Sequence, residues 1–154
     1  MIKFFNIDHA SDRLLPDLNN QINNRKHKIF LFTYMDGCMP CNSAKPMWDQ
    51  LSSMKQMIRR PIDQEQNIVI AKVNENAFGN LVPRLGPKPM AYPSISFFSD
   101  FKKKDEFDGM RDPNEFIKWI NKNIDMDKGV KRRRKTKRGK QIKKRKTKSK
   151  SRKR

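Results

Sequence analysis

The chain has 154 residues, which is enough for one domain of ordinary size with a single hydrophobic core. Its 36 lysines and arginines outnumber its 16 acids and give a formal charge of +20, yet residues 1–127 hold all 16 acids with 18 of the bases and are nearly neutral. Two cysteines are too few for a disulfide-scaffold fold, and no stretch approaches the roughly 18 apolar residues of a membrane span. The composition therefore predicts one domain at 1–127 and a strongly basic tail at 128–154.

The first half of the chain alternates strand and helix patterns. Residues 3–7 predict a short edge strand, residues 10–24 a helix, and the apolar run KIFLFTY at 28–34 a strand buried on both faces. A second helix is predicted from the cysteine motif CMPC to Arg60, because apolar residues recur there every three or four positions.

The second half continues with strands and a final helix. Residues 67–73 predict another buried strand, and a long loop separates it from two antiparallel strands at 93–99 and 102–109. Residues 112–124 predict a helix, because Asp112 is a favourable N-cap followed by proline. The order of the elements predicts an α/β layer architecture with one mixed sheet.

The chain's only cysteines, Cys38 and Cys41, form a CxxC motif between a predicted strand and a predicted helix. Unpaired backbone N–H groups and the positive end of the helix dipole stabilise a thiolate at this position. Cys38 is therefore the candidate nucleophile, and Cys41, one helical turn later, is the candidate resolving thiol.

Two other interpretations of the cysteines stay open. A zinc site normally has four ligands, and only His9 and His27 could join the two thiols, without the local spacing of a zinc motif. We therefore predict no metal. Free cysteines are also common as small core residues, so the pair could be two inert buried thiols.

Several motifs in order, between about residue 3 and residue 125, resemble the thioredoxin family. They are the strand, CMPC and helix of FLFTYMDGCMPCNSAKPMWDQL, the strand end AKVNEN, the YPSISFF motif and FDGMRDPNEFIKWI. The resemblance implies a thioredoxin fold, with a mixed sheet of four or five strands and helices on both faces. It also implies dithiol–disulfide exchange through Cys38 and Cys41 without a further cofactor.

The resemblance implies roles for residues outside the CxxC motif as well. Pro93 matches the family's cis-proline beside the active-site cysteines, and the backbone of Tyr92 would then hydrogen-bond an extended substrate. Pro46 matches the proline that bends the active-site helix, and Gly109 the glycine beside the substrate groove. An ordinary trans proline is the alternative for Pro93.

The sequence departs from the family pattern near the cysteines. Gly37 stands where the family usually has tryptophan, and Met39 stands before the proline of the CxxC motif. Phe32 replaces the buried acid that takes a proton from the second cysteine, which puts the rate of turnover in doubt. Lys72 matches the lysine next to that acid and either favours the thiolate electrostatically or extends its charge to solvent.

Residues 128–154 combine 18 basic residues with no acid and no aromatic residue, which predicts a disordered tail. Such a tail suits sequence-independent contact with nucleic acid or another polyanion. Its basic clusters also resemble nuclear-localisation signals, and contact with anionic lipid or a merely solubilising role are further alternatives.

Two hypotheses of function follow. The first is a thiol–disulfide oxidoreductase that acts on protein disulfides or dithiols, is regenerated by thioredoxin reductase or a glutathione system, and is tethered by its tail. The second is a non-enzymatic binding protein on the same scaffold that acts through its tail. The N-terminal residues lack the apolar run of a signal peptide, so we expect an intracellular protein, in the cytoplasm or nucleus or packaged with a genome.

Overall fold

The computed structural model describes residues 1–126, so the predicted basic tail at 128–154 lies outside the described residues. Five strands form one sheet in the order β1-β3-β2-β4-β5, in which β1, β3 and β2 are parallel and β4 and β5 are antiparallel to their neighbours. The mixed sheet is thereby confirmed, with five strands. They are β1 (Ile2–Ile7), β2 (Lys28–Tyr34), β3 (Ile68–Asn74), β4 (Ser94–Ser99) and β5 (Lys102–Glu106).

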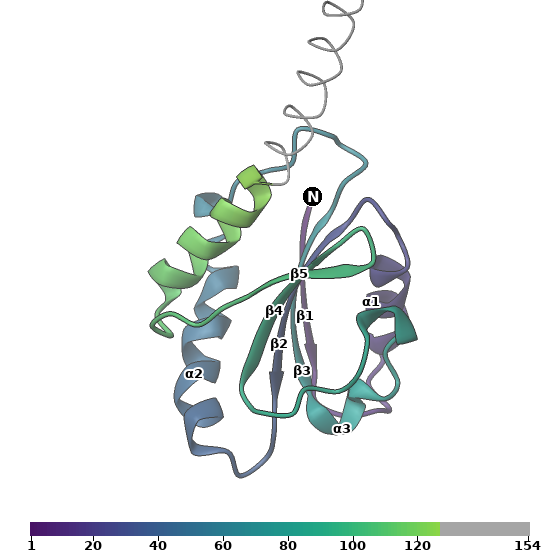
Figure 1. Ribbon diagram of the computed structural model, residues 1–154, viewed down its shortest axis with the longest axis vertical. Helices are drawn as coiled ribbons and strands as arrows, with labels where there is room; N and C mark the ends of the chain where they lie inside the picture. The colour runs from purple at the N-terminus through teal and green to yellow at the C-terminus, as the bar shows by residue number, and fades with distance from the viewer. Residues whose placement is uncertain (127–154) are drawn as a thin grey trace, which may run out of the picture.

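Helices cover both faces of this sheet, as predicted (Figure 1). One face carries α2 (Met39–Asp49) and a helix that runs from residue 113 to the last described residue, 126. The other carries α1 (Leu15–Ile22) and the short α3 (Glu75–Phe78). Within residues 1–126 no helix has both the length and the hydropathy to cross a bilayer.

The prediction that α2 continues to Arg60 was wrong. The helix ends at Asp49, and two short 3₁₀ turns follow it, at Gln50–Ser52 and Lys55–Met57. The hydroxyls of Ser52 and Ser53 donate hydrogen bonds to backbone carbonyls three residues earlier, at 3.1 and 2.8 Å, and so compete with the regular helical pattern. The apolar periodicity reflected burial along this segment rather than one continuous helix.

The predicted long loop before β4 contains two short elements that the sequence did not reveal, α3 and a 3₁₀ turn at Pro83–Leu85. The hairpin after β4 turns through Asp100 and Phe101, which both have positive φ, at 53° and 61°. That geometry matches the right-handed twist of the strands. The final strand ends at Glu106 rather than at Gly109.

Alternate residues of β2 divide the core into two halves. Phe30, Phe32 and Tyr34 face α2 and pack among large aromatic rings, together with both cysteines. Ile29 and Leu31 face α1 and pack mostly among aliphatic side chains. All seven residues of β2 are buried, as expected for a central strand covered on both faces.

Candidate active site

The two cysteines lie where β2 ends and α2 begins. Cys38 is the N-cap of α2, and its sulfur accepts a hydrogen bond from the backbone N–H of Cys41 at 3.2 Å. The two residues form a disulfide, with their Cα atoms 5.2 Å apart. The residue before the pair, Gly37, has a φ of 74°, a conformation that glycine adopts without strain. This glycine lets the chain turn from the strand into the helix, and a tryptophan would be strained at this φ.

The environments of the two sulfurs differ. Cys38 retains 8% of its surface exposed and lies at the helix N-terminus, whereas Cys41 is fully buried. In the reduced protein the backbone N–H and the helix dipole would stabilise a negative charge on the Cys38 sulfur. The geometry thus makes Cys38 the thiol that a substrate can reach, and Cys41 the thiol that only Cys38 can reach.

The segment before β4 lies directly against Cys38. The Tyr92–Pro93 peptide bond is cis, and the Tyr92 carbonyl oxygen lies 3.8 Å from the Cys38 sulfur. Burial raises the pKa of Tyr92, against the opposing influence of the Lys88 charge. Two of the three residues that sequence reasoning placed at the substrate site, Tyr92 and Pro93, therefore lie next to the dithiol.

Gly109 also lies at this end of the molecule. A hollow of about 470 Å³ separates Pro40 and Ala44 of α2 from Gly109 and Met110. A Cβ atom at Gly109 would come within 3.2 Å of the Phe107 ring, so a larger residue would push against the core. The hollow gives an extended chain room to lie beside α2.

Phe32 fills the position that an acid occupies in the resembled family. Its side chain is fully buried, with its ring 5.3 Å from that of Trp48. Lys72 lies across from it in register on β3. The Lys72 ammonium group is 2.7 Å from the carboxylate of Asp49, at the end of α2. This ion pair neutralises a lysine whose side chain is only 10% exposed.

Asp49 is thus an acid that sequence reasoning missed, and it lies too far along α2 to take a proton from Cys41 directly. The two residues are eight positions apart in the helix, or about 12 Å at 1.5 Å per residue. Among the described residues, no acidic side chain is hydrogen-bonded to either cysteine. The role of Lys72 in supporting the thiolate stays a prediction.

A second group that sequence reasoning missed fixes the loop before Cys38. The side-chain amide of Asn74 donates a hydrogen bond to the Asp36 carboxylate at 3.0 Å, while its oxygen accepts one from the N–H of Asn76. The Tyr34 hydroxyl donates to Asp8, and burial together with this contact raises the pKa of Tyr34. The position of Asn74, at the end of a buried strand, was the available signal.

Exposed methionines occupy the segments that surround the cysteines. Met39 lies within the CxxC motif and is 77% exposed, and Met35 lies three residues before Cys38. Met90 precedes Tyr92 by two residues, and Met110 follows Gly109; they are 102% and 78% exposed. These flexible, polarizable side chains give this end of the protein an apolar surface of adaptable shape.

Comparison with known proteins adds to this geometry. The profile of one family, Thioredoxin, matches residues 15–122. A thioredoxin of Rickettsia bellii is 24% identical over 91 residues, which are 59% of this chain and 76% of that protein.

Solved structures resemble the chain at low sequence identity. The first two thioredoxin domains of Naumovozyma dairenensis Eps1p give a TM-score of 0.51 at 19% identity, with 68% of this chain and 37% of that chain covered. Thioredoxin Mala s 13 of Malassezia sympodialis gives a TM-score of 0.51 at 17% identity, with 80% and 96% covered. These likenesses concern the fold, and the chain spans little more than a third of the Eps1p chain.

Proposed function

Because the chain belongs to the thioredoxin family, we propose that it is a thiol–disulfide oxidoreductase in which Cys38 attacks and Cys41 resolves. The observation that carries the proposal is the hydrogen bond from the Cys41 N–H to the Cys38 sulfur at the start of α2. It supports a thiolate at the one sulfur that retains exposed surface. The carbonyl of Tyr92, 3.8 Å from that sulfur, is available to an extended substrate backbone.

The cycle begins with the Cys38 thiolate, which attacks one sulfur of a substrate disulfide. The substrate S–S bond breaks, a mixed disulfide forms, and the other substrate sulfur leaves as a thiolate that takes a proton from water. Cys41 then loses its proton and attacks the Cys38 sulfur, which releases the second substrate thiolate. Two electrons have passed to the substrate, and Cys38 and Cys41 are left as a disulfide.

The step that differs from the resembled family is the loss of the Cys41 proton. With Phe32 in the acid position, water or a different base must accept this proton. The Lys72–Asp49 ion pair has a net charge of zero, so it adds little field at the sulfur. We expect resolution of the mixed disulfide to be the slow step.

The proposal extends to partners and location. The substrates are protein disulfides or dithiols, and thioredoxin reductase or a glutathione system regenerates the dithiol. Residues 128–154 bind nucleic acid or another polyanion and so concentrate the dithiol on that assembly, in the cytoplasm or nucleus or in a packaged genome. Between 50 and 200 mM salt, tail binding with 6–10 phosphate contacts should weaken by about 10³–10⁵. Affinity that stayed flat over this range would contradict it.

The test of the enzymatic proposal is the reduction potential of the Cys38–Cys41 pair in the full chain, measured in defined thiol buffers with thiols counted by alkylation and mass spectrometry. We expect one reversible two-electron transition. A value near about −270 mV indicates a reductant, and one between about −180 and −120 mV an oxidant or isomerase. No reversible transition would remove the enzyme proposal.

The buried Phe32 favours a second candidate, a binding protein that uses the scaffold without fast exchange. Its activity would depend on residues 128–154 and not on the dithiol. Comparing the full chain with a chain that ends at residue 127 separates the two. The enzyme proposal requires the same reduction potential in both chains. The binding proposal requires that polyanion binding disappear when the tail is removed.

A further inference from the structure

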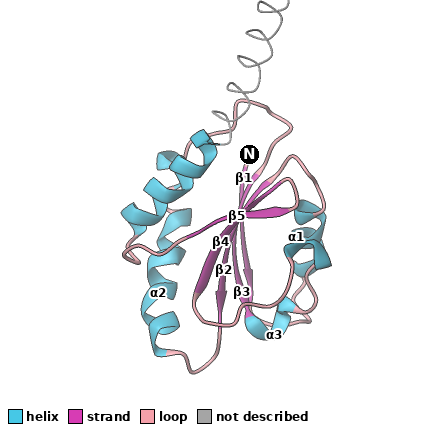
Figure 2. Cartoon of the chain, in the orientation of Figure 1, coloured by secondary structure: helices cyan, strands magenta, loops and turns pink. Residues whose placement is uncertain are grey.

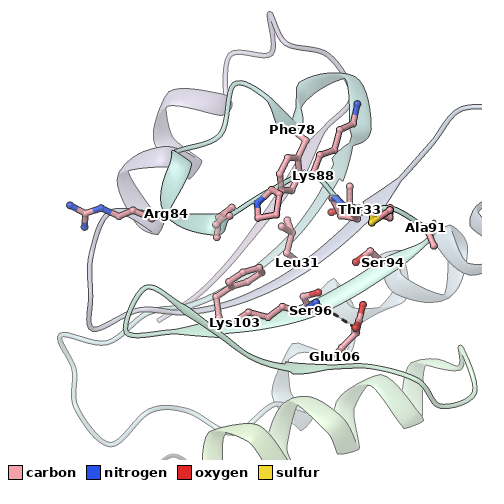
Figure 3. A pocket seen from close by; sticks show the side chains of 16 residues that line it. Leu31, Thr33, Phe78, Arg84, Lys88, Ala91, Ser94, Ser96, Lys103 and Glu106 are labelled. Carbon is pink, nitrogen blue, oxygen red and sulfur yellow. Dashed lines mark ion pairs between the residues drawn. The ribbon is translucent and has the colours of Figure 1, made fainter.

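A hollow of about 500 Å³ lies on the α1 face of the sheet, away from the cysteines. Leu31, Phe78, Leu85 and Phe98 in its wall belong to the α1-side core, whereas both cysteines belong to the other. Figure 3 shows side chains of β2 and β4 directed into it. The volume falls within the range of about 300–1,000 Å³ that is typical of small-molecule sites.

The hollow exists because little secondary structure covers this part of the sheet. The connection from β3 to β4 contains only the four-residue α3 and a short 3₁₀ turn (Figure 2). The segment GPKPMA, residues 86–91, lines the hollow and includes Pro87 and Pro89. Proline fixes φ near −65°, so this segment is stiff and resists collapse onto the sheet.

Three hydroxyls lie on the floor where apolar side chains would be expected. Thr33, Ser94 and Ser96 are only 1%, 8% and 5% exposed. Thr33 of β2 and Ser94 of β4 are register partners, and Ser96 lies two residues further along the same face. Serine is a poor strand former, and on a buried strand face it sacrifices apolar packing.

These hydroxyls are not used by the protein itself. Within residues 1–126, none of the three donates or accepts a side-chain hydrogen bond. Among the same residues, no fully buried side-chain oxygen lacks a partner, so the three oxygens must reach the surface of the hollow. Their hydrogen-bonding capacity is therefore available to a molecule that enters the hollow.

The rim is mainly cationic. Arg84, Lys88 and Lys103 line the hollow with a single carboxylate, Glu106 (Figure 3). Lys88 is also ion-paired with Glu75, which does not line the hollow, so the three bases and these two acids leave one net positive charge at the rim. The Lys103 ammonium group is 3.4 Å from the Glu106 carboxylate, and both side chains are about half exposed. The ion pair is therefore weak, and Lys103 can pair with an incoming anion instead. The Arg84 guanidinium lies 4.0 Å from the centre of the Phe101 ring, which holds it beside the rim.

We infer that this hollow binds a small amphiphilic anion, with an apolar body against Leu31 and Phe98, hydrogen bonds to Thr33, Ser94 and Ser96, and its acidic group at the cationic rim. The class includes medium-chain carboxylates and aromatic sulfonates. The hollow lies on the opposite face of the sheet from the dithiol, although its wall segment at 86–91 leads directly into Tyr92. Binding there does not depend on the redox function proposed above.

The test uses the full chain and the fluorescent amphiphilic anion anilinonaphthalene sulfonate (ANS), with decanoate as competitor. We expect a saturable fluorescence increase that decanoate reverses. Ser96→Phe fills the floor and should weaken ANS binding at least about tenfold. If Ser96→Phe unfolds cooperatively like the unaltered chain and still binds ANS equally well, the site is wrongly assigned.

A pair of rim variants keeps the test decisive if Ser96→Phe does not fold. Lys103→Glu should weaken ANS binding by about fivefold. Lys104→Glu makes the same change on the next residue of β5, which is exposed and does not line the hollow. It should leave the affinity unchanged within about twofold. Equal losses in both variants would show that ANS responds only to overall charge and would overturn the assignment.

Discussion

The two faces of the sheet are packed by different kinds of side chains. On the α2 face, seven aromatic rings contact one another in a continuous chain with centroids 4.6 to 5.5 Å apart; they are Phe30, Phe32, Trp48, Phe97, Phe107, Phe116 and Trp119. On the α1 face the core is mainly aliphatic and leaves a hollow of about 500 Å³. Within residues 1–126, every aromatic ring pair belongs to the α2 face.

The packing on the α2 face suits it to holding the cysteines in place, whereas the packing on the α1 face leaves room for a ligand. Interlocked rings have few alternative arrangements, so they hold α2, and with it both cysteines, at a fixed place on the sheet. The α1 face has spare volume and unpaired hydroxyls, which suit a ligand rather than a rigid support. One sheet can thus carry a fixed reaction centre on one side and a binding hollow on the other.

The largest expected effect concerns the chemistry on the α2 face. Cys38→Ser should reduce disulfide exchange by at least about 10³-fold, because it removes the only thiol that retains exposed surface. Cys41→Ser should instead accumulate a mixed disulfide between Cys38 and substrate, visible by mass spectrometry after alkylation. Full turnover in Cys41→Ser would mean that the two roles are reversed or that an external thiol resolves the intermediate.

Variants at Phe32 test whether this buried ring, which packs the α2 face, slows the loss of the Cys41 proton. Phe32→Asp should speed resolution of the mixed disulfide by about 10²-fold, because it restores a carboxylate at the position where the family's acid accepts the proton of the second cysteine. It should also lower the free energy of unfolding by about 3–5 kcal/mol, since a fully buried ring is lost.

Phe32→Asn is the matched control, because it has the shape of aspartate without the basic group. Resolution rates are measured by single-turnover quenching, and stabilities by urea unfolding. If both variants resolve at the same rate, proton acceptance by residue 32 is not what limits the reaction.

A smaller effect compares one phenylalanine from each face. Phe30 is fully buried, with ring centroids of Phe97 and Trp119 at 4.6 and 5.4 Å. Phe30→Ala should lower the free energy of unfolding by about 3–5 kcal/mol. Phe98 is 6% exposed and already borders the hollow, so Phe98→Ala should lose about half as much. Equal losses in urea unfolding would show that the hollow does not weaken packing on the α1 face.

The sequence was most informative where local chemistry decides the structure. The run KIFLFTY marked the central strand because all seven residues are buried, and Asp112 marked the last helix because its carboxylate accepts a hydrogen bond from the N–H of Asn114. The place of Cys38 at the helix N-terminus followed from the same local pattern. Such features depend on a few neighbouring residues, so they can be predicted without the fold.

Features that depend on distant residues were not predictable in the same way. Lys72 and Asp49 are 23 residues apart, and only the packing of α2 on β3 brings their charges together. The hollow depends on how little chain covers β4, although the alternation of Ser94 and Ser96 in PSISFFS was visible in the sequence. Serine at every second position of a buried strand was a local irregularity that sequence reasoning did not use.

The smallest expected effect is that acid lowers the stability of the two faces in different pH ranges. On the α1 side, burial lowers the pKa of His27 below its ordinary value of 6.5, so the unfolded chain binds a proton that the folded protein resists. This contribution to stability is present above 6.5 and is lost as the pH falls below it. Replacing the imidazole by an amide, His27→Gln, should therefore flatten the decline of the melting temperature in mildly acid buffer.

On the α2 side, Asp105 accepts hydrogen bonds from the side chains of Trp119 and Asn123, at 2.8 and 3.1 Å. Burial alone would raise the pKa of this carboxyl, but these two donors, the backbone N–H of Glu106 and the charge of Lys122 together outweigh burial and lower it below 3.8. Its contribution is therefore intact above 3.8 and is lost as the pH falls through the lower folded value. Asp105→Asn should flatten only that strongly acid part of the profile. If either variant altered both pH ranges equally, the two halves of the core would not respond to acid independently.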